Sequence, residues 1–272
     1  MIMLEVGKQN LHTHTIYCDG KNTVEEMILA ACEKGFQSIG FSSHSFMQGR
    51  TLPQQLIYDY KAEIAFMKKK YANQIEVFCG LECEMLGETE LTGFDYLIGA
   101  VHYFRFGEEF VSFDRDLEDV QSMIKQYFDG DGMAYAKAYY QELSKLPQYG
   151  EFDIIAHFDL ITKFSEKASL LDETSKEYRW AAIEAAEALA GKIPYFEVNT
   201  GAMTRGYRTS PYPNIFLLQE LKRLGFGAII STDCHDARFL DYKYQEAVEL
   251  LKRCGFKERF ILTKNGFIPI EL

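Results

Sequence analysis

Short apolar runs alternate with longer amphipathic segments along the whole chain. Runs of this length, bounded by turn residues, are typical of strands that are buried on both faces of a parallel sheet. The first strand is predicted to begin at Asn10, and the others are predicted over residues 38–42, 75–81, 96–101, 152–156, 195–198 and 227–231, with a short final strand at 260–262. The apolar runs therefore predict seven main strands.

The segments between these strands carry apolar residues at helical spacing. Thr23 and Glu26 form a capping-box pattern for a helix that ends near Gly35, and Pro53 begins a helical segment that ends near Lys70. Further helices are predicted up to about residue 146, with an interruption near 129–132, and over 177–190, 214–224 and 245–254. A polar, aromatic insertion over 103–115 and a loop over 199–213 interrupt this alternation.

Strands that alternate with helices predict parallel βαβ units, and the number of strands favours an α/β barrel over an open sheet. The length of 272 residues fits one such barrel, and there is no internal repeat, low-complexity tract or interdomain linker. We therefore expect a single domain over residues 1–272. In such barrels the functional residues lie at the C-terminal ends of the strands.

Composition narrows the possible partners and the cellular location. The net charge of -11 opposes nonspecific binding to nucleic acid or to an anionic membrane, because both need a positive surface. The first residues lack a signal-peptide pattern, and no apolar stretch has membrane-spanning length, so we expect a cytoplasmic location. The six cysteines lack CxxC spacing and are expected to be free thiols.

All six histidines stand at or just after the C-terminal end of a predicted strand, or in the first residues of the loop that follows it. They are His12, His14, His44, His102, His157 and His235. A few histidines reach strand ends by chance, but six out of six indicate a functional rim. The two-residue spacing of His12 and His14 puts both imidazoles on one face of a strand.

Three carboxylates, Asp19, Glu82 and Asp233, are predicted to lie at the same rim. Barrel closure would bring the pair Asp233 and His235 next to the pair His12 and His14. Six imidazoles and three carboxylates exceed the ligands of one tetrahedral ion, so the sequence favours a cluster of two or three divalent ions. Zinc, iron and manganese all suit this mixture of ligands.

In this order along the chain, these residues resemble the polymerase and histidinol phosphatase (PHP) superfamily of metal-dependent phosphoesterases. The shared motifs are H-T-H at 12–14, G-F-S-S-H at 40–44, G-L-E at 80–82, G-A-V-H at 99–102, A-H-F-D at 156–159 and S-T-D-C-H-D at 231–236. Within the superfamily, H-T-H-x4-D-G, H-F-D-L-I-T-K-F and F-E-V-N-T are most similar to the histidinol-phosphate phosphatases of histidine biosynthesis.

The resemblance implies a distorted TIM-like (β/α)7 barrel with a trinuclear metal centre. It implies that His12, His14, Glu82 and Asp233 hold one ion, that Glu82, His102 and His157 hold a second, and that Asp19, His44 and His235 hold the third. Asp19 stands where many relatives carry histidine. Cys18, Cys83 and Cys234 adjoin proposed ligands, but adjacent residues of a strand point to opposite faces, so they are not expected to bind metal.

The expected reaction is hydrolysis of a small phosphomonoester, L-histidinol phosphate, by hydroxide that the metal ions activate. Asp233 is the candidate for accepting the proton of the water, and His235 is the candidate for protonating the leaving alkoxide. Arg205 is the first candidate for binding the phosphate, followed by Arg208 and Lys163. The aromatic residues Phe46 and Tyr103, among others near the ligands, are left without a role.

Three alternatives remain open at this point. The substrate could be a nucleotide or a nucleic-acid 3' end, although the acidic chain has no basic patch to favour one. The chain could be a noncatalytic metal-binding regulatory domain, which the full set of nine ligands disfavours. Amidohydrolase chemistry on another barrel shares the H-x-H start, but it would usually need a bridging lysine on a middle strand. The sequence makes no prediction of the oligomeric state.

Overall fold

The predicted apolar runs form one parallel sheet. The computed structural model describes residues 7–272, and its main sheet has seven strands in the order β1-β2-β5-β6-β9-β10-β11, with every neighbouring pair parallel. These strands are β1 (Gln9–Asn10), β2 (Ser38–His44), β5 (Glu76–Glu84), β6 (Tyr96–Ala100), β9 (Ile154–Ile155), β10 (Tyr195–Asn199) and β11 (Gly227–Ser231). Strand order in space follows the order in sequence, as expected for successive βαβ units.

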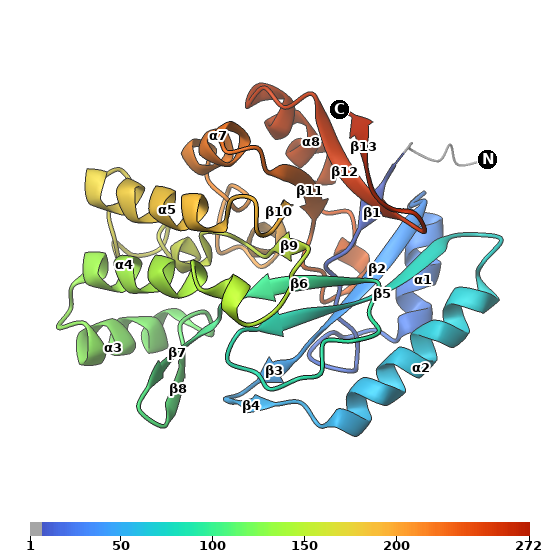
Figure 1. The fold of residues 1–272 in the computed structure, drawn as a ribbon, viewed down its shortest axis with the longest axis horizontal. Coiled ribbons are helices and arrows are strands. Elements are labelled where there is room, and N and C mark those ends of the chain that lie inside the picture. The colour runs from blue at the N-terminus through green and yellow to red at the C-terminus, as the bar shows by residue number, and fades with distance from the viewer. Residues whose placement is uncertain (1–6) are drawn as a thin grey trace.

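The helices surround the strands on the outside (Figure 1). They are α1 (Val24–Glu33), α2 (Gln54–Lys70), α3 (Leu117–Tyr127), α4 (Gly132–Leu143), α5 (Lys176–Leu189), α6 (Gly201–Thr204), α7 (Ile215–Arg223) and α8 (Tyr244–Arg253), with short 3-10 turns at Leu146–Gln148, Leu160–Thr162 and Ala237–Phe239. The predicted capping box is present, because Thr23 and Glu26 satisfy each other's backbone N–H groups at the start of α1. No helix within residues 7–272 is long and apolar enough to cross a membrane.

The sheet nearly closes into a barrel at its C-terminal rim. β1 and β11 are not paired along their lengths, but a parallel bridge joins Thr13 to Cys234 just beyond their ends. There the backbone N–H of His14 donates to the carbonyl of Cys234 (2.8 Å), and the N–H of Cys234 donates to the carbonyl of His12 (3.0 Å). This closure holds the histidines that follow β1 against the residues that follow β11, which confirms the predicted TIM-like barrel.

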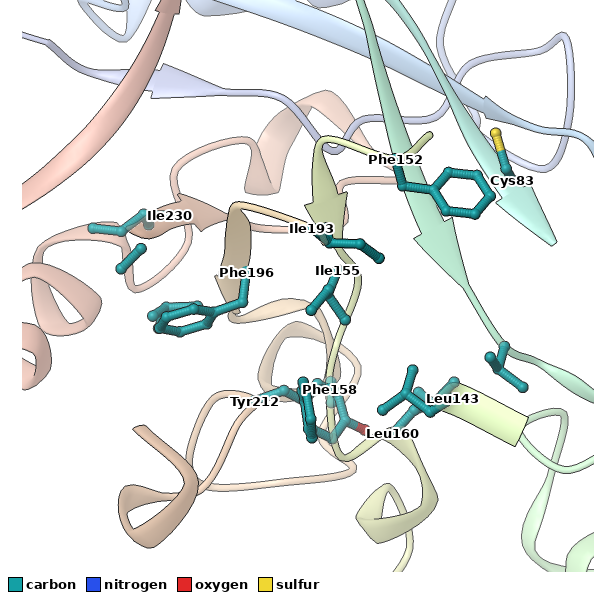
Figure 2. Close-up of a cluster of buried hydrophobic side chains, with 14 of the residues drawn as sticks. Cys83, Leu143, Phe152, Ile155, Phe158, Leu160, Ile193, Phe196, Tyr212 and Ile230 are labelled. Carbon is teal, nitrogen blue, oxygen red and sulfur yellow. The ribbon is translucent and has the colours of Figure 1, made fainter. Parts of the chain in front are cut away.

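Two apolar layers hold the barrel together. The interior contains residues from the strands and no helical residue: Leu11, Phe78, Tyr96, Ile98, Ala100, Ile154, Ala156, Ile229 and Leu262. The outer layer lies between strands and helices, and Figure 2 shows part of it, with Ile155 of β9 and Phe196 of β10 near Phe158 and Tyr212. Because side chains alternate along a strand, a strand such as β5 contributes to both layers, with Phe78 in the interior and Val77 in the outer layer.

Tyr96 fills the middle of the barrel where two neighbouring strands carry glycine. A Cβ atom at Gly40 would lie 2.5 Å from the hydroxyl of Tyr96, and one at Gly80 would lie 2.2 Å from its ring. The hydroxyl donates to the carbonyl of Leu11 and lies 3.1 Å from that of Phe41. The glycines in the G-F-S-S-H and G-L-E motifs therefore leave room for the ring of Tyr96 in the barrel interior.

Three hairpins were not predicted as such from the sequence. They are β3 (Phe46–Met47) with β4 (Arg50–Thr51), β7 (Tyr103–Phe106) with β8 (Glu109–Ser112), and β12 (Glu258–Thr263) with β13 (Gly266–Glu271). The second hairpin occupies the predicted aromatic insertion. The third extends the predicted final strand and covers the N-terminal ends of the barrel strands, where Leu262 exchanges two hydrogen bonds of 2.8 Å with the side chain of Gln9.

Candidate metal centre

The residues predicted to bind metal meet at the C-terminal rim of the barrel. Four of them, His12, His102, His157 and Asp233, stand two residues beyond the last residue of a strand. His44 is the last residue of β2, and its register partner on β5 is Glu82. His14, Asp19 and His235 lie in the loops that follow. The parallel register therefore brings together all nine residues that the sequence indicated.

Glu82 lies between two groups of imidazoles. Its Oε1 atom is 3.1 Å from His157 Nε2 and 3.4 Å from His102 Nε2. Its Oε2 atom is 3.3 Å from His12 Nε2 and 3.6 Å from His14 Nε2. The two carboxylate oxygens thus face different pairs of nitrogens, so one residue can bridge two ions.

A third group lies nearer the surface and is centred on Asp19. Its Oδ1 atom is 3.2 Å from His235 Nε2, 3.5 Å from His44 Nε2 and 3.8 Å from His14 Nδ1. The side chain of Asp19 is 42% exposed, whereas that of Glu82 is 1% exposed. His14 therefore stands within reach of this outer group as well as of the inner one.

Asp233 completes the inner group from a left-handed backbone conformation (φ 45°). Its Oδ1 atom is 3.2 Å from His14 Nε2, and its Oδ2 atom accepts a hydrogen bond of 3.0 Å from Arg205. Gly201 packs against it so closely that a Cβ atom there would lie 2.8 Å from the Cβ of Asp233. Backbone strain of this kind at a rim residue indicates a functional position.

The unpaired buried atoms of these side chains fit divalent cations. His12 Nε2 and His14 Nε2 are buried and have no hydrogen-bond partner among residues 7–272, whereas Glu82 Oε2 lies 2.8 Å from His44 Nδ1. Leaving such atoms unpaired costs free energy, and a bound cation would remove that cost. Three groups of side chains have ligand atoms close enough to hold an ion: His12, His14 and Glu82; Glu82, His102 and His157; and His14, Asp19, His44 and His235.

The same side chains shift one another's pKa values. Burial acts to raise the pKa of Glu82, but the imidazoles of His12, His44 and His102 hold it well below its usual range. Burial lowers the pKa of His12, whereas Glu197 and Glu82 raise it further than burial lowers it. Without an ion, the carboxylates therefore hold protons on the imidazoles, and a cation can take their place.

Two buried glutamates behind the ligands were missed from the sequence. Glu84, on β5, lies 3.1 Å from His102 Nδ1 and also accepts the backbone N–H of His102 (2.7 Å). Glu197, on β10, lies 2.9 Å from His12 Nδ1. Glu197 interrupts the apolar run 195–198, and a charged residue that is buried in a strand must be paired. This position could therefore have indicated from the sequence that Glu197 has a partner. Metal-ligating histidines commonly have such partners on their second nitrogen.

The cysteines next to the ligands do not point their sulfur atoms into the centre of the cluster. Cys234 Sγ lies 3.1 Å from the carbonyl of Asp236, and Cys83 Sγ lies 3.6 Å from the carbonyl of Leu81. Cys18 lies behind His14, with its Sγ atom 3.3 Å from His14 Nδ1. Burial raises the pKa of the Cys18 thiol, but His14 offsets this and lowers it to about 6.

A cavity of about 790 Å³ lies over the centre and contains two of the three predicted phosphate-binding residues. Arg205 lines it, with Nη1 3.3 Å from His235 Nδ1. Lys163 also lines it, and its ammonium lies 3.6 Å from Asp114 Oδ2. Arg208 lies outside this cavity and donates to the carbonyl of Thr162 (2.8 Å), so the structure assigns it a contact that the loop sequence did not indicate.

The two hairpins β3–β4 and β7–β8 form one wall of the cavity. The ring of Phe46 packs against those of Tyr103 and Phe110, with centroids 5.2 and 5.3 Å away. The hydroxyl of Tyr103 accepts the backbone N–H of Gln48 (3.0 Å), which ties the two hairpins together. All four residues line the cavity. The aromatic side chains that had no predicted role thus face the space above the metal-binding residues.

The model of the PHP domain family matches residues 10–201 of this chain, a segment that carries seven of the nine predicted ligands. The chain belongs to the PHP family. Two curated members are similar over nearly their whole length: the "Probable histidinol-phosphatase" of Schizosaccharomyces pombe (25% identical, covering 93% of this chain and 89% of the relative) and the histidinol-phosphatase of Bacillus subtilis (25%, 91% and 99%).

A solved structure has the same fold. The histidinol phosphate phosphatase of Lactococcus lactis, crystallised with zinc, L-histidinol and phosphate, superposes with a TM-score of 0.74 at 21% identity. The alignment covers 96% of this chain and 99% of the other. The PHP barrel thus extends over nearly the whole of this chain, as the motifs in the sequence implied.

Proposed function

We propose that this PHP protein uses bound divalent metal ions to hydrolyse L-histidinol phosphate to L-histidinol and inorganic phosphate. The observation that carries the proposal is the set of three interlocking ligand groups, joined through Glu82 and His14, beneath a cavity that also holds Arg205. The substrate is taken from relatives named histidinol-phosphatase, which are similar to this chain over at least 89% of their length.

In this proposal the ligands divide as the family resemblance implies. His12, His14, Glu82 and Asp233 hold one ion, Glu82, His102 and His157 hold a second, and Asp19, His44 and His235 hold the third, with His14 also within reach of it. Zinc, iron and manganese suit these ligands. When bound, such ions supply hydroxide near neutral pH and offset the negative charge of the phosphoryl oxygens.

The chain's own residues position the ester and move protons. The guanidinium of Arg205 holds Asp233 Oδ2 at 3.0 Å and lines the cavity, so it is placed to bind the phosphate of an ester there. Lys163 adds positive charge at the same cavity. Asp233 orients the attacking water and accepts its proton. His235 can protonate the leaving alkoxide only when its Nε2 atom does not hold the third ion, because a nitrogen that binds a metal carries no proton.

The test is phosphate release from a panel of esters by the metal-loaded protein. The panel contains L-histidinol phosphate, sugar phosphates, mononucleotides and an aryl phosphate, with a separate nuclease assay on single-stranded DNA. We expect a strong preference for L-histidinol phosphate. Turnover of other esters but not of this one would reject the substrate while retaining the phosphoesterase. No turnover of any ester by metal-loaded protein would favour a noncatalytic role.

A further inference from the structure

The carboxylate of Glu197 is fully buried and accepts four hydrogen bonds. Oε2 lies 2.9 Å from His12 Nδ1 and 2.6 Å from the hydroxyl of Ser231. Oε1 accepts the backbone N–H of His157 and the side-chain amide of Asn199, each at 2.7 Å. One side chain on β10 therefore contacts residues that follow β1 and β9 as well as the last residue of β11.

The contact with His12 decides which nitrogen of that ring carries the proton. His12 Nε2 points at Glu82 and Asp233, 3.3 and 3.6 Å away, so it is the nitrogen available to an ion. A neutral imidazole that offers Nε2 as a ligand must carry its hydrogen on Nδ1. The carboxylate of Glu197 can only accept at Nδ1, so it stabilises the tautomer that metal binding requires.

We propose that Glu197 is a positioning residue of the metal centre, which fixes the tautomer of His12 and, through Oε1, the backbone of His157. The inference rests on the proposed function, since it concerns the ions that these histidines hold. His12 belongs to one inner ligand group and His157 to the other. A single carboxylate outside the ligand set thereby orients ligands of two ions.

The substitution Glu197→Gln separates this role from simple packing, because glutamine has nearly the same shape. Its amide offers an acceptor on one side and an N–H donor on the other. The N–H groups of His157 and Asn199 can only donate to it, so the amide oxygen must face them and the NH2 must face His12 Nδ1 and Ser231. The Ser231 hydroxyl can reverse its role, but His12 must then accept at Nδ1 and carry its proton on Nε2, the nitrogen that should bind metal.

Ser231→Ala is the matched control. It removes one hydrogen bond from the same carboxylate oxygen and leaves an acceptor facing His12 Nδ1. If Glu197 serves only to fill space and join strands, the two variants should affect metal binding to a similar extent. If it sets the tautomer, only Glu197→Gln should weaken metal binding.

The experiment measures metal stoichiometry and affinity by competition with a chromogenic chelator, using zinc and the full-length protein. We expect the affinity of Glu197→Gln to fall roughly 10- to 100-fold, the range for loss of such a partner, and that of Ser231→Ala to stay within a few-fold. A folded Glu197→Gln protein with wild-type affinity would overturn the inference. Wild-type protein that binds no zinc would instead reject the proposed metal-dependent function.

A second measurement determines the tautomer in the wild-type protein, so it does not depend on the folding of Glu197→Gln. In ¹⁵N-histidine-labelled, zinc-loaded protein, long-range ¹H–¹⁵N correlation spectra distinguish Nδ1–H from Nε2–H rings, and the His12 signals are assigned by their loss in His12→Gln. We expect a protected Nδ1–H on His12. A His12 ring protonated on Nε2 would refute the assigned role.

Discussion

Glu82 is the residue that joins two of the three ligand groups. Its two oxygens lie within 3.6 Å of nitrogens from five histidines, including His44 Nδ1 at 2.8 Å. No other residue among 7–272 appears in two of the three ligand groups except His14. Removing the charge of Glu82 should therefore affect two ions at once.

We predict that Glu82→Gln loses bound metal and phosphate release by more than the roughly 10- to 100-fold expected for loss of a partner outside the ligand set. Glu88→Gln, at an exposed position after the same strand, should change neither. Metal analysis and a phosphate-release assay on both purified variants provide the check. Retention of wild-type metal content by Glu82→Gln would remove Glu82 from the bridging position.

Gly201 matters because its missing side chain leaves space for Asp233. A Cβ atom at position 201 would lie 2.9 Å from the carbonyl of Thr232 as well as 2.8 Å from Asp233 Cβ. We predict that Gly201→Ala displaces Asp233 and lowers phosphate release by up to about 100-fold, as misplacement by about 1 Å can do. Steady-state kinetics together with thermal unfolding would show the loss in a folded protein.

Gly130→Ala is the control for this change. Gly130 has a φ of 79° and nothing within 4 Å of its would-be Cβ, so alanine there should cost about 1 to 2 kcal/mol of stability and leave phosphate release unchanged. If Gly201→Ala behaved in the same way, the close packing on Asp233 would have no bearing on activity.

At the scale of elements, the two ends of the barrel have different roles. The candidate ligands lie at one end, and a hairpin that stabilises the fold covers the other. Ligands stand at or beyond the C-terminal ends of the strands, whereas the hairpin β12–β13 covers the N-terminal ends. Leu262 of this hairpin is 5% exposed and packs in the barrel interior. The two ends of the barrel should therefore respond independently to mutation.

Leu262→Ala tests this separation. The substitution should lower the free energy of unfolding by about 2 to 5 kcal/mol, because it removes buried apolar volume, while zinc bound per folded molecule stays at the wild-type value. Urea unfolding of the metal-free protein and metal analysis of the folded protein measure the two quantities. A folded Leu262→Ala protein that binds less zinc per molecule than the wild type would mean that the two ends are coupled.

The sequence predicted the strands, and the clustering of the candidate ligands at one rim, because both depend on local pattern. Apolar runs set the strands, and parallel strands bring their C-terminal ends to one rim, so His12, Glu82 and Asp233 could be placed together without coordinates. The residues that hydrogen-bond these ligands could not be placed in the same way, because they depend on which face of a neighbouring strand lies behind each ligand. Glu197 and Glu84 were therefore missed, although a carboxylate in an apolar strand needs a partner.

The loop and hairpin residues were harder to predict for a different reason. Arg205 and Arg208 lie three residues apart in one loop, yet one faces the cavity and the other donates to Thr162. The short helix α6 (Gly201–Thr204) ends just before Arg205, and its four residues are too few to show a helical period. Loop composition identified the cationic segment but not the direction of each side chain.

At the scale of the whole molecule, the metal centre should make stability depend on pH in opposite ways with and without ions. Burial lowers the pKa values of His12 and His44, but Glu82 beside both rings, with Glu197 at His12 and Asp19 at His44, raises them well above 6.5. A raised folded-state pKa contributes stability that is present below pH 6.5 and is lost as the pH rises through the folded-state pKa. His14 adds little to this slope, because its pKa rises to about 9 while that of its partner Cys18 falls to about 6. Metal binding needs the neutral imidazole, so its contribution grows with pH.

We therefore predict that the melting temperature of metal-free protein falls as the pH rises above 6.5, while the gap between metal-loaded and metal-free protein widens. Differential scanning calorimetry at matched ionic strength measures both curves. His12→Gln should flatten the decline of the metal-free curve. A metal-free protein whose stability rises over this range would show that the buried imidazoles are not held protonated by their neighbours.

The central claim is that the clustered histidines and carboxylates hold ions that hydrolyse L-histidinol phosphate. It is tested most directly by measuring phosphate release from this ester by protein stripped with a chelator and then reloaded with zinc, iron or manganese. We predict that release is lost on stripping and returns in proportion to the metal bound. Release that persists in fully stripped protein, or that stays absent after metal is shown to be bound, would contradict it.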